Sequence, residues 1–486
     1  MIMYSLLPLL ALIAPLFVGA LCIFTYPFVF LESFFRKIEK IVLLLGTTLT
    51  LLIILSMIPY ILAGQTLETP VFSLRVDSIN MAGAIGVALI SFLASIYNVR
   101  AERGGRLKPN VYNFFILLFL VCMLGLLFSY DLFGIFLFVE LTIGVSIVLV
   151  IHAPGKLSPE AAFKYLIITA ISALFVLLAV LMVFVITHNS NILVMLDNSA
   201  QLLENPRLIA LVVVCFVIGL GADIGLVPFH GWVPDVLPAS TPIINVFFTA
   251  EPIAFTLALY KLIYPFYTIY PSQSFIWILS GLGFISVVFG ALLAYPQRDF
   301  YRMFAYCSIE EFGHMILPLA LFTPLGLTAG QFYIVNVSLM KAGLVACLGS
   351  VFINTGTRNM DSLGGLVGSM RTTALSYIIC ALSIAGVPPL SGFYAKLLIY
   401  TAIYEFMLQK AGLFASVLTV IFLACISIVS LVYLMRSFHM IFLGEPTEIL
   451  RGLRDVPFLM WLPTVIISGL ALLLGVQPNI LLSIAK

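Results

Sequence analysis

The chain has 486 residues and a net charge of +2, and 62% of its residues are hydrophobic while only 9% are charged. Soluble domains are nearer half apolar and a quarter charged, so this composition excludes an ordinary soluble protein. The small net charge gives no indication of a nucleic-acid partner. The mean hydropathy of +1.19 is typical of a chain that crosses a membrane many times.

Apolar stretches of about 20 residues, the length that crosses a ~30 Å hydrocarbon core, recur along the whole chain. We predict fourteen such spans and therefore an all-α polytopic membrane protein. No signal-peptide cleavage site is evident, so the first span is expected to stay in the mature chain. The spans begin near Tyr4, Ile41, Ser78, Tyr112, Asp131, Ser158, Arg207, Thr241, Ser274, Tyr301, Leu325, Thr372, Gly412 and Pro457.

The distribution of basic residues supports this number of spans. If the N-terminus lies outside, fifteen Lys and Arg residues fall in inside loops, three lie within spans, and five lie at outside ends, namely Arg75, Arg207, Lys261, Lys410 and Lys486. Cytoplasmic loops of membrane proteins carry such an excess of basic residues. We therefore predict a multi-pass protein of the cell (plasma) membrane with both termini on the outer side.

One short motif occurs twice. Gly225–Trp232 and Gly386–Phe393 share the order Gly, two residues, Pro, apolar, polar, Gly, aromatic, at a constant offset of 161 residues. In the predicted topology the two copies run in opposite directions, which indicates an inverted repeat. Gly and Pro interrupt helices, and an interruption within lipid survives only inside protein or beside a hydrated cavity. We predict that spans seven and twelve are broken at Gly225, Pro228, Gly386, Pro388 and Pro389.

We interpret residues 1–486 as a single transmembrane domain. Its predicted parts are three N-terminal helices (1–111), a first inverted five-helix repeat of spans four to eight (112–264), a second repeat of spans nine to thirteen (273–443) and a last helix (457–486). Paired broken helices in such repeats are the best sequence indication of an ion path in a transporter.

Ionisable residues lie near the middle of otherwise apolar spans. Glu140 in span five, Asp223 in span seven, Lys341 in span eleven and Lys396 in span twelve are the clearest cases. A charge at the bilayer centre costs about 2.5–3.5 kcal/mol on insertion scales, so such residues usually face a polar interior and mark an ion or proton path. Desolvation disfavours the charged form, which allows a buried carboxyl or amine to exchange a proton. A structural ion pair is the alternative for each of them.

Other ionisable residues lie nearer the span ends or beside the first break. Lys164 lies one or two turns inside span six, so it either joins the path or extends to the membrane surface. Asp223 and His230 flank the break in span seven, where His230 either accepts protons or caps free backbone groups. The remaining candidates for the proton or ion path are Glu251 in span eight and Glu310, Glu311 and His314 in span ten.

The cysteine and histidine patterns predict no cofactor site. The seven cysteines are scattered singly without a Cys-x-x-Cys pair, which argues against a disulfide framework, a zinc site or an iron–sulfur cluster. The five histidines form no facing pairs for haem, and no Walker-type phosphate loop is present. We expect no metal and no cofactor in this chain, so any redox centres should belong to partner subunits.

These features together resemble the antiporter-like subunits of respiratory complex I, Mrp-type cation/proton antiporters and membrane-bound hydrogenases. The resemblance implies fourteen helices with breaks in the seventh and twelfth, a central hydrophilic axis that carries protons, and a place in a large complex. It also implies that Glu140, Lys164, Lys341 and Lys396 match charged positions of the family. The segments that carry the resemblance are Phe138–Leu141, Ala161–Tyr165, Val227–Asp235, Ala305–Ile309, Leu339–Gly343 and Leu382–Lys396.

Asp223 departs from the family pattern, which places a lysine at this position opposite the glutamate of span five. Two interpretations follow. Either Glu140 and Asp223 share a proton or a cation with Lys164 as the counter-charge, or the first half of the chain has another use. Two carboxylates in one site would equally suit Na⁺, a hard ion that takes oxygen ligands.

Other positions also differ from the family. Phe248 and Phe255 stand near the places of the usual lysine or histidine of span eight, and Val337 replaces a histidine four residues before Lys341. The segment Ser308–Gly313 is nearer to hydrogenase and formate-hydrogenlyase relatives than to complex I.

We therefore expect a proton-translocating, or alternatively Na⁺-coupled, antiporter-like subunit of a redox-driven complex. The favoured parent is a membrane-bound hydrogenase or a related ferredoxin-linked reductase. The expected partners are other membrane subunits, both antiporter-like and small, with iron–sulfur and nickel–iron centres elsewhere in the complex. Alternatives are the D-type subunit of an Mrp Na⁺/H⁺ antiporter and a scaffold that has lost its ion path. The chain itself is expected to be non-catalytic.

Overall fold

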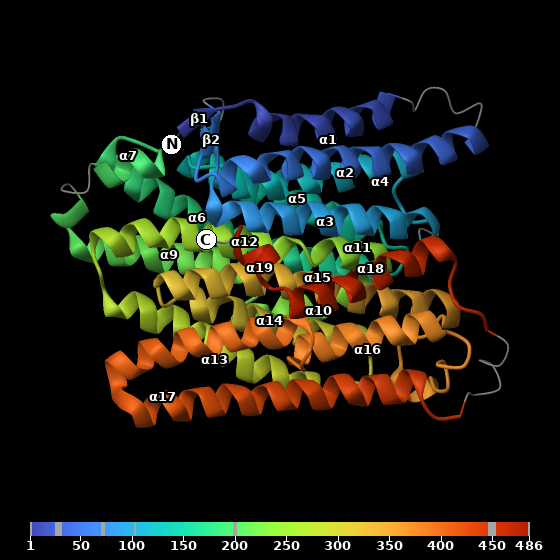
Figure 1. Cartoon of the computed structure of the whole chain (residues 1–486). Helices are drawn as coiled ribbons and strands as arrows, with labels where there is room; N and C mark the ends of the chain where they lie inside the picture. Colours follow the sequence, from blue (N-terminus) through green and yellow to red (C-terminus); the bar gives the residue numbers. More distant parts are fainter. Residues whose placement is uncertain are drawn as a thin grey trace.

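The fold was analysed in a computed structural model, which describes residues 2–24, 32–69, 73–101, 104–197, 202–445 and 453–484. Long helices run side by side across the molecule, and both termini lie toward the same end (Figure 1). The first part contains α1 (Leu7–Phe24), α2 (Glu32–Leu62), α3 (Ser78–Ala101), α4 (Pro109–Phe128), α5 (Leu132–His152), α6 (Leu157–Thr187), α7 (Ile192–Asp197), α9 (Pro206–Ile224), η3 (His230–Trp232), α10 (Val233–Ala239), α11 (Pro242–Phe248) and α12 (Glu251–Ile269). The second part contains α13 (Gln273–Ala294), α14 (Phe300–Leu319), α15 (Pro324–Thr355), η4 (Met360–Ser362), α16 (Arg371–Ala385), α17 (Ser391–Phe442), α18 (Phe458–Val476) and α19 (Asn479–Leu482).

The predicted all-α polytopic fold is confirmed. Among the described residues, eleven helices are long and apolar enough to cross a membrane, and two shorter apolar helices cover Leu7–Ile23 and Arg371–Ala385. The long helix α17 is interrupted at Gly412, whose φ of 82° and ψ of 177° are not helical, so it is two helices joined end to end. α14 is not among these helices because its acidic pair lowers its hydropathy. When α14 is included, each predicted span corresponds to a helix or to a broken helix.

Three short strands form a small sheet that the sequence did not indicate. β1 (Ile2–Tyr4) pairs in parallel with β2 (Thr66–Thr69), and β2 pairs antiparallel with β3 (Leu74–Val76). The first helix therefore begins at Leu7, because residues 2–4 belong to the sheet. This corrects the start predicted near Tyr4.

The breaks in spans seven and twelve have the same backbone geometry. α9 ends at Gly225 (φ 89°), and the N–H groups of Gly225 and Leu226 donate to the carbonyl oxygen of Gly221 at 3.1 and 2.9 Å. α16 ends at Gly386 (φ 87°), and the N–H groups of Gly386 and Val387 donate to the carbonyl oxygen of Leu382 at 3.1 and 2.9 Å. A positive φ at the residue after a helix is the glycine-terminated stop in which these bonds satisfy the last carbonyls.

The two broken helices run in opposite directions. α9 leads away from the end that carries the termini, whereas α16 and the first part of α17 lead toward it (Figure 1). The predicted inversion of the motif is therefore present in the fold. The division of the chain into repeats at 112–264 and 273–443 stays a prediction.

α13 and α14 pack with their backbones in direct contact. An ideal Cβ at Gly290 would lie 2.3 Å from the amide nitrogen of Glu310, and one at Gly313 would lie 2.4 Å from the carbonyl oxygen of Gly283. Such an approach requires glycine on both helices. It also fixes the position of the acidic pair on α14.

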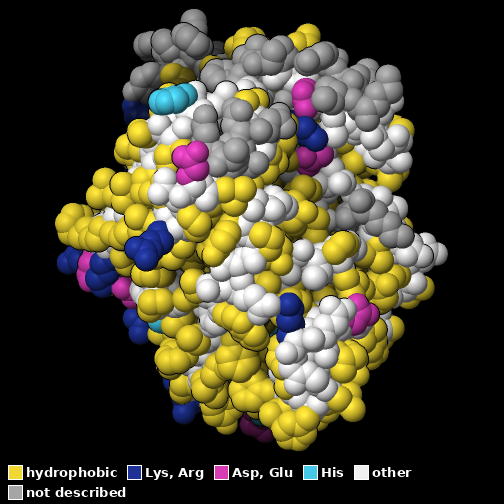
Figure 2. All heavy atoms as spheres, turned by 90° about the vertical axis from the view of Figure 1, so that its left-hand side faces the viewer, with side chains coloured by type: hydrophobic (Ala, Val, Ile, Leu, Met, Phe, Trp, Pro, Cys, Tyr) yellow, Lys and Arg dark blue, Asp and Glu magenta, His cyan; other side chains and the backbone are white. Residues whose placement is uncertain are grey.

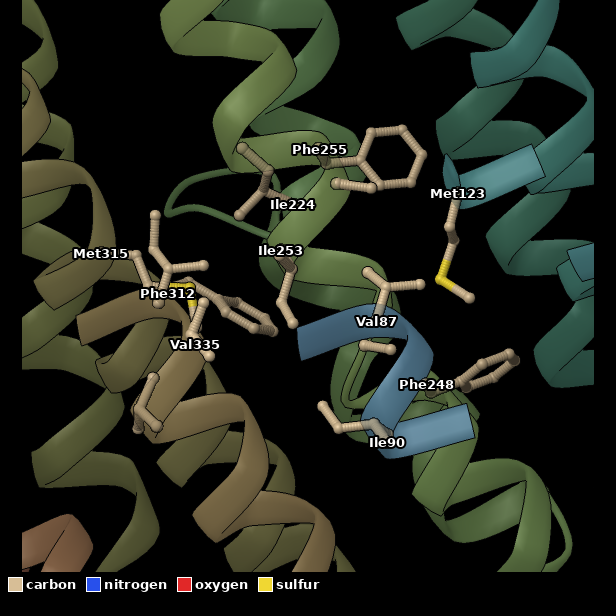
Figure 3. Packing of buried hydrophobic residues seen from close by; sticks show 14 of the residues in the cluster. Val87, Ile90, Met123, Ile224, Phe248, Ile253, Phe255, Phe312, Met315 and Val335 are labelled. Atoms are coloured by element: carbon tan, nitrogen blue, oxygen red, sulfur yellow. The ribbon is translucent and has the colours of Figure 1, made fainter. Parts of the chain in front are cut away.

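The apolar core lies where α3, α4, α12, α14 and α15 meet. Figure 3 shows this packing, and every side chain it labels is less than a tenth exposed. The labelled residues are Val87, Ile90, Met123, Ile224, Phe248, Ile253, Phe255, Phe312, Met315 and Val335.

The face that carries both termini exposes few charges. Figure 2 shows mostly hydrophobic and uncharged side chains there, with scattered Lys, Arg, Asp and Glu. The outward sides of the helices are apolar as well, with Leu52, Leu174, Phe289 and Phe414 all exposed. Such surfaces fit lipid or other membrane subunits.

We expect Gly290→Ala to lower the free energy of unfolding by about 1–3 kcal/mol, the usual cost of overpacking. The new methyl group would meet the α14 backbone, which cannot retreat without moving the whole helix. Gly281→Ala on the same helix is the matched control, because a Cβ there meets nothing within 4 Å. Titration with SDS from mild detergent micelles would measure both variants. Equal stability of the two would contradict the close packing.

Candidate functional site

Three ionisable side chains of α14 lie together in the core. Glu310, Glu311 and His314 are fully buried, and one ligand atom from each lies within 4.8 Å of the others. They follow the helix period, so Glu310 and His314 lie one turn apart on the same face. The His314 Nδ1 is 3.3 Å from the carbonyl oxygen of Glu310, and its Nε2 has no hydrogen-bond partner among the described residues.

Hydroxyl groups from neighbouring helices satisfy most of these carboxylate oxygens. Ser430 donates to Oε1 of Glu310, and Tyr433 donates to Oε2 at 2.8 Å. Tyr333 donates to Oε2 of Glu311. Three of the four oxygens therefore accept a hydrogen bond. A buried carboxylate needs such donors because desolvation without them is costly.

Lys396 lies next to this cluster, at the start of α17. Its side chain is 4% exposed, and Nζ donates to Ser427 Oγ at 3.0 Å. Its ammonium also interacts electrostatically with Glu311 and Glu310. Opposite charges at short range offset the cost of burying each other. The structure thus brings the predicted Glu310 and Lys396 together.

Lys341 is a buried lysine on α15 that lies against aromatic rings. It is 2% exposed, and its ammonium makes no hydrogen bond or ion pair with any residue that the structure describes. Instead Nζ lies 4.3 Å from the ring centre of Phe312 and 5.7 Å from that of Phe304. Aromatic faces attract a cation, but less strongly than a carboxylate does.

The first half of the chain contributes three ionisable acids, Asp223, Glu251 and Glu140. Asp223 at the end of α9 is 3% exposed, and neither carboxylate oxygen has a partner in the described part of the chain. Glu251 accepts from Ser146 at 3.1 Å and from Tyr165 at 3.4 Å. Glu140 on α5 is half-buried, and the Asp223 carboxyl interacts electrostatically with both Glu251 and Glu140.

A cavity of about 30 Å³ joins the two halves. Its lining includes Asp223 and Glu251 from the first half and Lys341 from the second half, with Phe304 and Phe312 between them. One water needs roughly 10–15 Å³ by this measure, so the cavity has room for about two or three water molecules. Ionisable residues of both halves therefore line the same small cavity.

The structure does not place Lys164 as the counter-charge of Glu140 and Asp223. Its side chain is 49% exposed, and Nζ lies 3.0 Å from Glu160 and 3.1 Å from Asp235. The alternative prediction, that this lysine extends to the surface, describes its position.

His230 lies at the break itself, in the short helix η3. Its ring is half-buried, and Nδ1 has no hydrogen-bond partner among the described residues. The residue after next, Trp232, donates its indole N–H to the carbonyl oxygen of Ala222 at 2.9 Å and so covers the end of α9. Whether His230 accepts protons stays a prediction.

Lys261 is a buried cation, which corrects the prediction that it lies at an outside end of a span. On α12 it is 5% exposed and donates to the carbonyl oxygens of Leu126 at 3.1 Å, Leu127 at 2.9 Å and Ser129 at 2.5 Å. These carbonyls end α4, where a cation is favoured by the helix dipole. Lys261 therefore caps the C-terminal end of α4. The sequence indicated its burial only through its place within span eight, ten residues after Glu251.

A cluster of polar side chains near Lys261 lies outside the membrane spans. Tyr130, between α4 and α5, donates to Asp77, and Arg75 lies 3.4 Å from the same carboxylate. Burial, and next the Asp77 carboxylate, raise the pKa of Tyr130 well above its ordinary value. The phenol therefore keeps its proton and acts as a donor.

We expect Tyr433→Phe to destabilise the protein by about 1.5–3 kcal/mol, because it removes a donor from the buried Glu310 carboxylate. The matched control is Tyr377→Phe, which breaks a buried bond of 2.6 Å to the neutral Ser437 hydroxyl. That variant should cost only about 0.5–1.5 kcal/mol. SDS unfolding of both variants is the measurement, and equal losses would show that Glu310 carries no charge.

Comparisons with known proteins identify the family of the chain and show the same fold in solved structures. A family model described as NADH:quinone oxidoreductase/Mrp antiporter, TM, matches residues 129–423, which is more than half of the chain. NADH-quinone oxidoreductase subunit N of Desulforudis audaxviator is 30% identical over 386 residues, which cover 78% of this chain and 74% of that protein. Na(+)/H(+) antiporter subunit A1 of Staphylococcus haemolyticus is 27% identical and covers 84% of this chain, which spans only 53% of that longer protein.

Solved structures show the same fold. A chain of the membrane-bound sulfane sulfur reductase, an archaeal respiratory membrane complex, superposes with a TM-score of 0.86 at 24% identity, covering 99% of this chain and 96% of that one. A chain of the Mrp complex from Dietzia sp. DQ12-45-1b superposes with a TM-score of 0.83 at 22% identity, covering 97% of this chain and 96% of that one. A chain of respiratory complex I from Thermus thermophilus superposes with a TM-score of 0.82 at 21% identity, covering 98% of each chain. The chain therefore belongs to the antiporter-like family of multi-pass membrane subunits that NADH:quinone oxidoreductases and Mrp antiporters share.

Proposed function

We propose that this chain is a proton-translocating subunit of a redox-driven membrane complex. The observation that carries the proposal is the row of buried ionisable groups inside the bundle. Asp223, Glu251 and Lys341 line one cavity. Glu311 interacts electrostatically with both Lys341 and Lys396, and Glu310 interacts with Lys396.

The row suits proton transfer because each charge alters its neighbours. When a carboxyl gains a proton, the nearest lysine loses part of its stabilisation and releases its own proton more readily. Glu311 interacts electrostatically with both Lys396 and Lys341, so it can relay such a change between them. Moving one charge through 100 mV is worth about 2.3 kcal/mol, which is within the range of such interactions.

The helix breaks supply the connection to water. Gly225 and Gly386 end α9 and α16 close to Asp223 and Lys396 respectively, and a Cβ at Gly386 would lie 3.0 Å from Cδ of Lys396. Interrupted helices expose backbone groups that require protein or water as partners. Protons would reach the row at these points.

The favoured parent is a membrane-bound hydrogenase or a related ferredoxin-linked reductase. The family includes subunits of redox complexes, and the segment Ser308–Gly313 with its acidic pair supports this choice. Iron–sulfur and nickel–iron centres would then lie in partner subunits. The exposed apolar sides of α6 and α17 would contact lipid, further antiporter-like subunits and small membrane subunits.

A second candidate is the D-type subunit of an Mrp Na⁺/H⁺ antiporter. The 27% identity to a Na(+)/H(+) antiporter subunit over 84% of this chain favours it. Purification in mild detergent separates the candidates. Partners that contain iron–sulfur or nickel–iron centres support the redox parent, and a set of small membrane subunits without redox centres supports the antiporter.

The membrane is proposed to be the cell membrane, with both termini outside. The fold places the termini at one end, and the excess of basic residues in the loops of the other end supports this orientation. This orientation can be tested with a single cysteine introduced near the C-terminus and a membrane-impermeant thiol reagent. If the reagent fails to label this cysteine in intact cells, the C-terminus lies inside and the proposed orientation is reversed.

We expect Lys396→Ala to reduce proton pumping by the assembled complex by about 10-fold or more, because positioned proton-transfer groups contribute roughly 10²–10⁴-fold. Lys164→Ala removes a half-exposed lysine of the same charge and should leave most of the pumping intact. Acidification of inverted membrane vesicles is the measurement, with subunit composition as the control for assembly. Unchanged pumping in a normally assembled Lys396→Ala complex would instead identify the chain as a scaffold.

A further inference from the structure

We propose that Glu310, Glu311 and His314 of α14 form a binding site for one Zn²⁺ ion. We call these three residues the α14 triad. The scattered histidines of the sequence predict no metal site, whereas the fold brings one of them beside two carboxylates. The inference rests on the proposed proton path in one respect, because Zn²⁺ at the triad would inhibit that path.

The spacing of the α14 triad along its helix suits metal binding. Glu310 and Glu311 precede His314 by four and three residues, so the three side chains project from one face of α14. Ligands at these spacings hold metal ions in di-iron helix bundles and in zinc proteases. One ligand atom from each residue lies within 4.8 Å of the others. Zn–N and Zn–O bonds of about 2.0–2.2 Å can therefore meet at one ion after small rotations of the side chains.

Two atoms of the triad have no hydrogen-bond partner in the part of the chain that the structure describes. They are Nε2 of His314 and Oε1 of Glu311, and both side chains are 0% exposed. Unsatisfied polar atoms at such depth are costly, so they favour a ligand supplied from outside the protein. An imidazole nitrogen and a carboxylate oxygen are both ligands of Zn²⁺.

The donor atoms favour a transition metal over the common hard cations. Ca²⁺ takes about six to eight oxygen ligands, and Mg²⁺ requires octahedral oxygen geometry. The triad instead offers one nitrogen together with carboxylate oxygens. Imidazole suits Zn²⁺, and three protein ligands with one open position are a common arrangement at zinc.

Hydroxyl donors hold the two carboxylates in place without a metal. Ser430 and Tyr433 donate to Glu310, and Tyr333 donates to Glu311. A carboxylate has about four lone-pair sites, so these hydrogen bonds leave room for a metal ion as well. Zn²⁺ is therefore expected as a reversible ligand and not as a structural metal.

The charge of Lys396 opposes metal binding. Its ammonium interacts electrostatically with both glutamates and with His314. It donates its hydrogen bond to Ser427, however, and forms no direct ion pair with either glutamate. Two carboxylates, one ammonium and Zn²⁺ together leave one excess positive charge, whereas the carboxylates and Zn²⁺ alone are neutral. We therefore expect the affinity for Zn²⁺ to rise when the charge of this lysine is removed.

A metal ion at the triad would interrupt the proposed proton path. Glu311 interacts electrostatically with both Lys341 and Lys396, and it could not accept a proton while it binds Zn²⁺. The helix break at Gly386 lies beside Lys396 and is the expected route by which the ion enters. Zn²⁺ would thus act at the point where the path links two lysines.

Equilibrium dialysis of ZnCl₂ against the purified complex that carries this chain tests the site. His314→Gln and Glu311→Gln should each weaken Zn²⁺ binding by about 10-fold or more, because loss of a group that merely supports a ligand already costs about 10–100-fold. Zinc K-edge X-ray absorption should show nitrogen and oxygen neighbours at about 2.0–2.2 Å. The matched control is Glu251→Gln, which removes a buried acid outside the triad and should bind Zn²⁺ as the parent does.

Lys396→Met is expected to tighten Zn²⁺ binding by about 10-fold, because it removes a like charge beside the ion. A gain in affinity cannot come from a general loss of folding, and subunit composition checks assembly. Identical Zn²⁺ isotherms for the parent, His314→Gln and Lys396→Met complexes would overturn the proposal. Proton pumping in vesicles is measured separately with and without ZnCl₂. Zn²⁺ that binds as described but leaves pumping unchanged would support the metal site and contradict the proposed proton path through α14.

Discussion

The membrane interior offers no water to a charged side chain, and this constraint organises the whole molecule. Every ionisable group in the bundle must find its partner within the protein. In the second half Lys396 accompanies Glu310 and Glu311, and three hydroxyl groups donate to these carboxylates, whereas Lys341 lies against two aromatic rings. In the first half the buried Lys261 binds backbone carbonyl oxygens at the end of α4, and neither carboxylate oxygen of Asp223 has a hydrogen-bond partner in the described part of the chain.

The backbone makes this arrangement possible. Close contact between α13 and α14 at Gly290 and Gly313 holds the acidic pair of α14 at the centre of the bundle. The glycine-terminated ends of α9 and α16 place Asp223 and Lys396 beside interruptions where helix hydrogen bonding stops. The charges and the breaks therefore occur together because each needs the other: a broken helix needs polar partners, and a buried charge needs access to water.

Asp223 changes the balance that the family resemblance implied. A lysine at this position would pair with the glutamate of span five within the first half. With an acid in its place, Asp223 interacts electrostatically with the acids Glu251 and Glu140, and Lys341 of the second half lines the same cavity as Asp223.

The sequence by itself determined the helical membrane fold, the number of spans and the two oppositely directed breaks. These features follow from hydropathy, glycine and proline, which act locally and are visible in a linear chain. It also identified most of the buried charges, because a charged residue within an apolar span stands out. Tertiary structure alone decided which charges meet. Lys164 reaches the surface, Lys261 closes α4, and the hydroxyls of Tyr333, Ser430 and Tyr433 serve the acids of α14 from other helices. Such partners depend on helix rotation and packing, for which the spacing of residues along one helix carries no information.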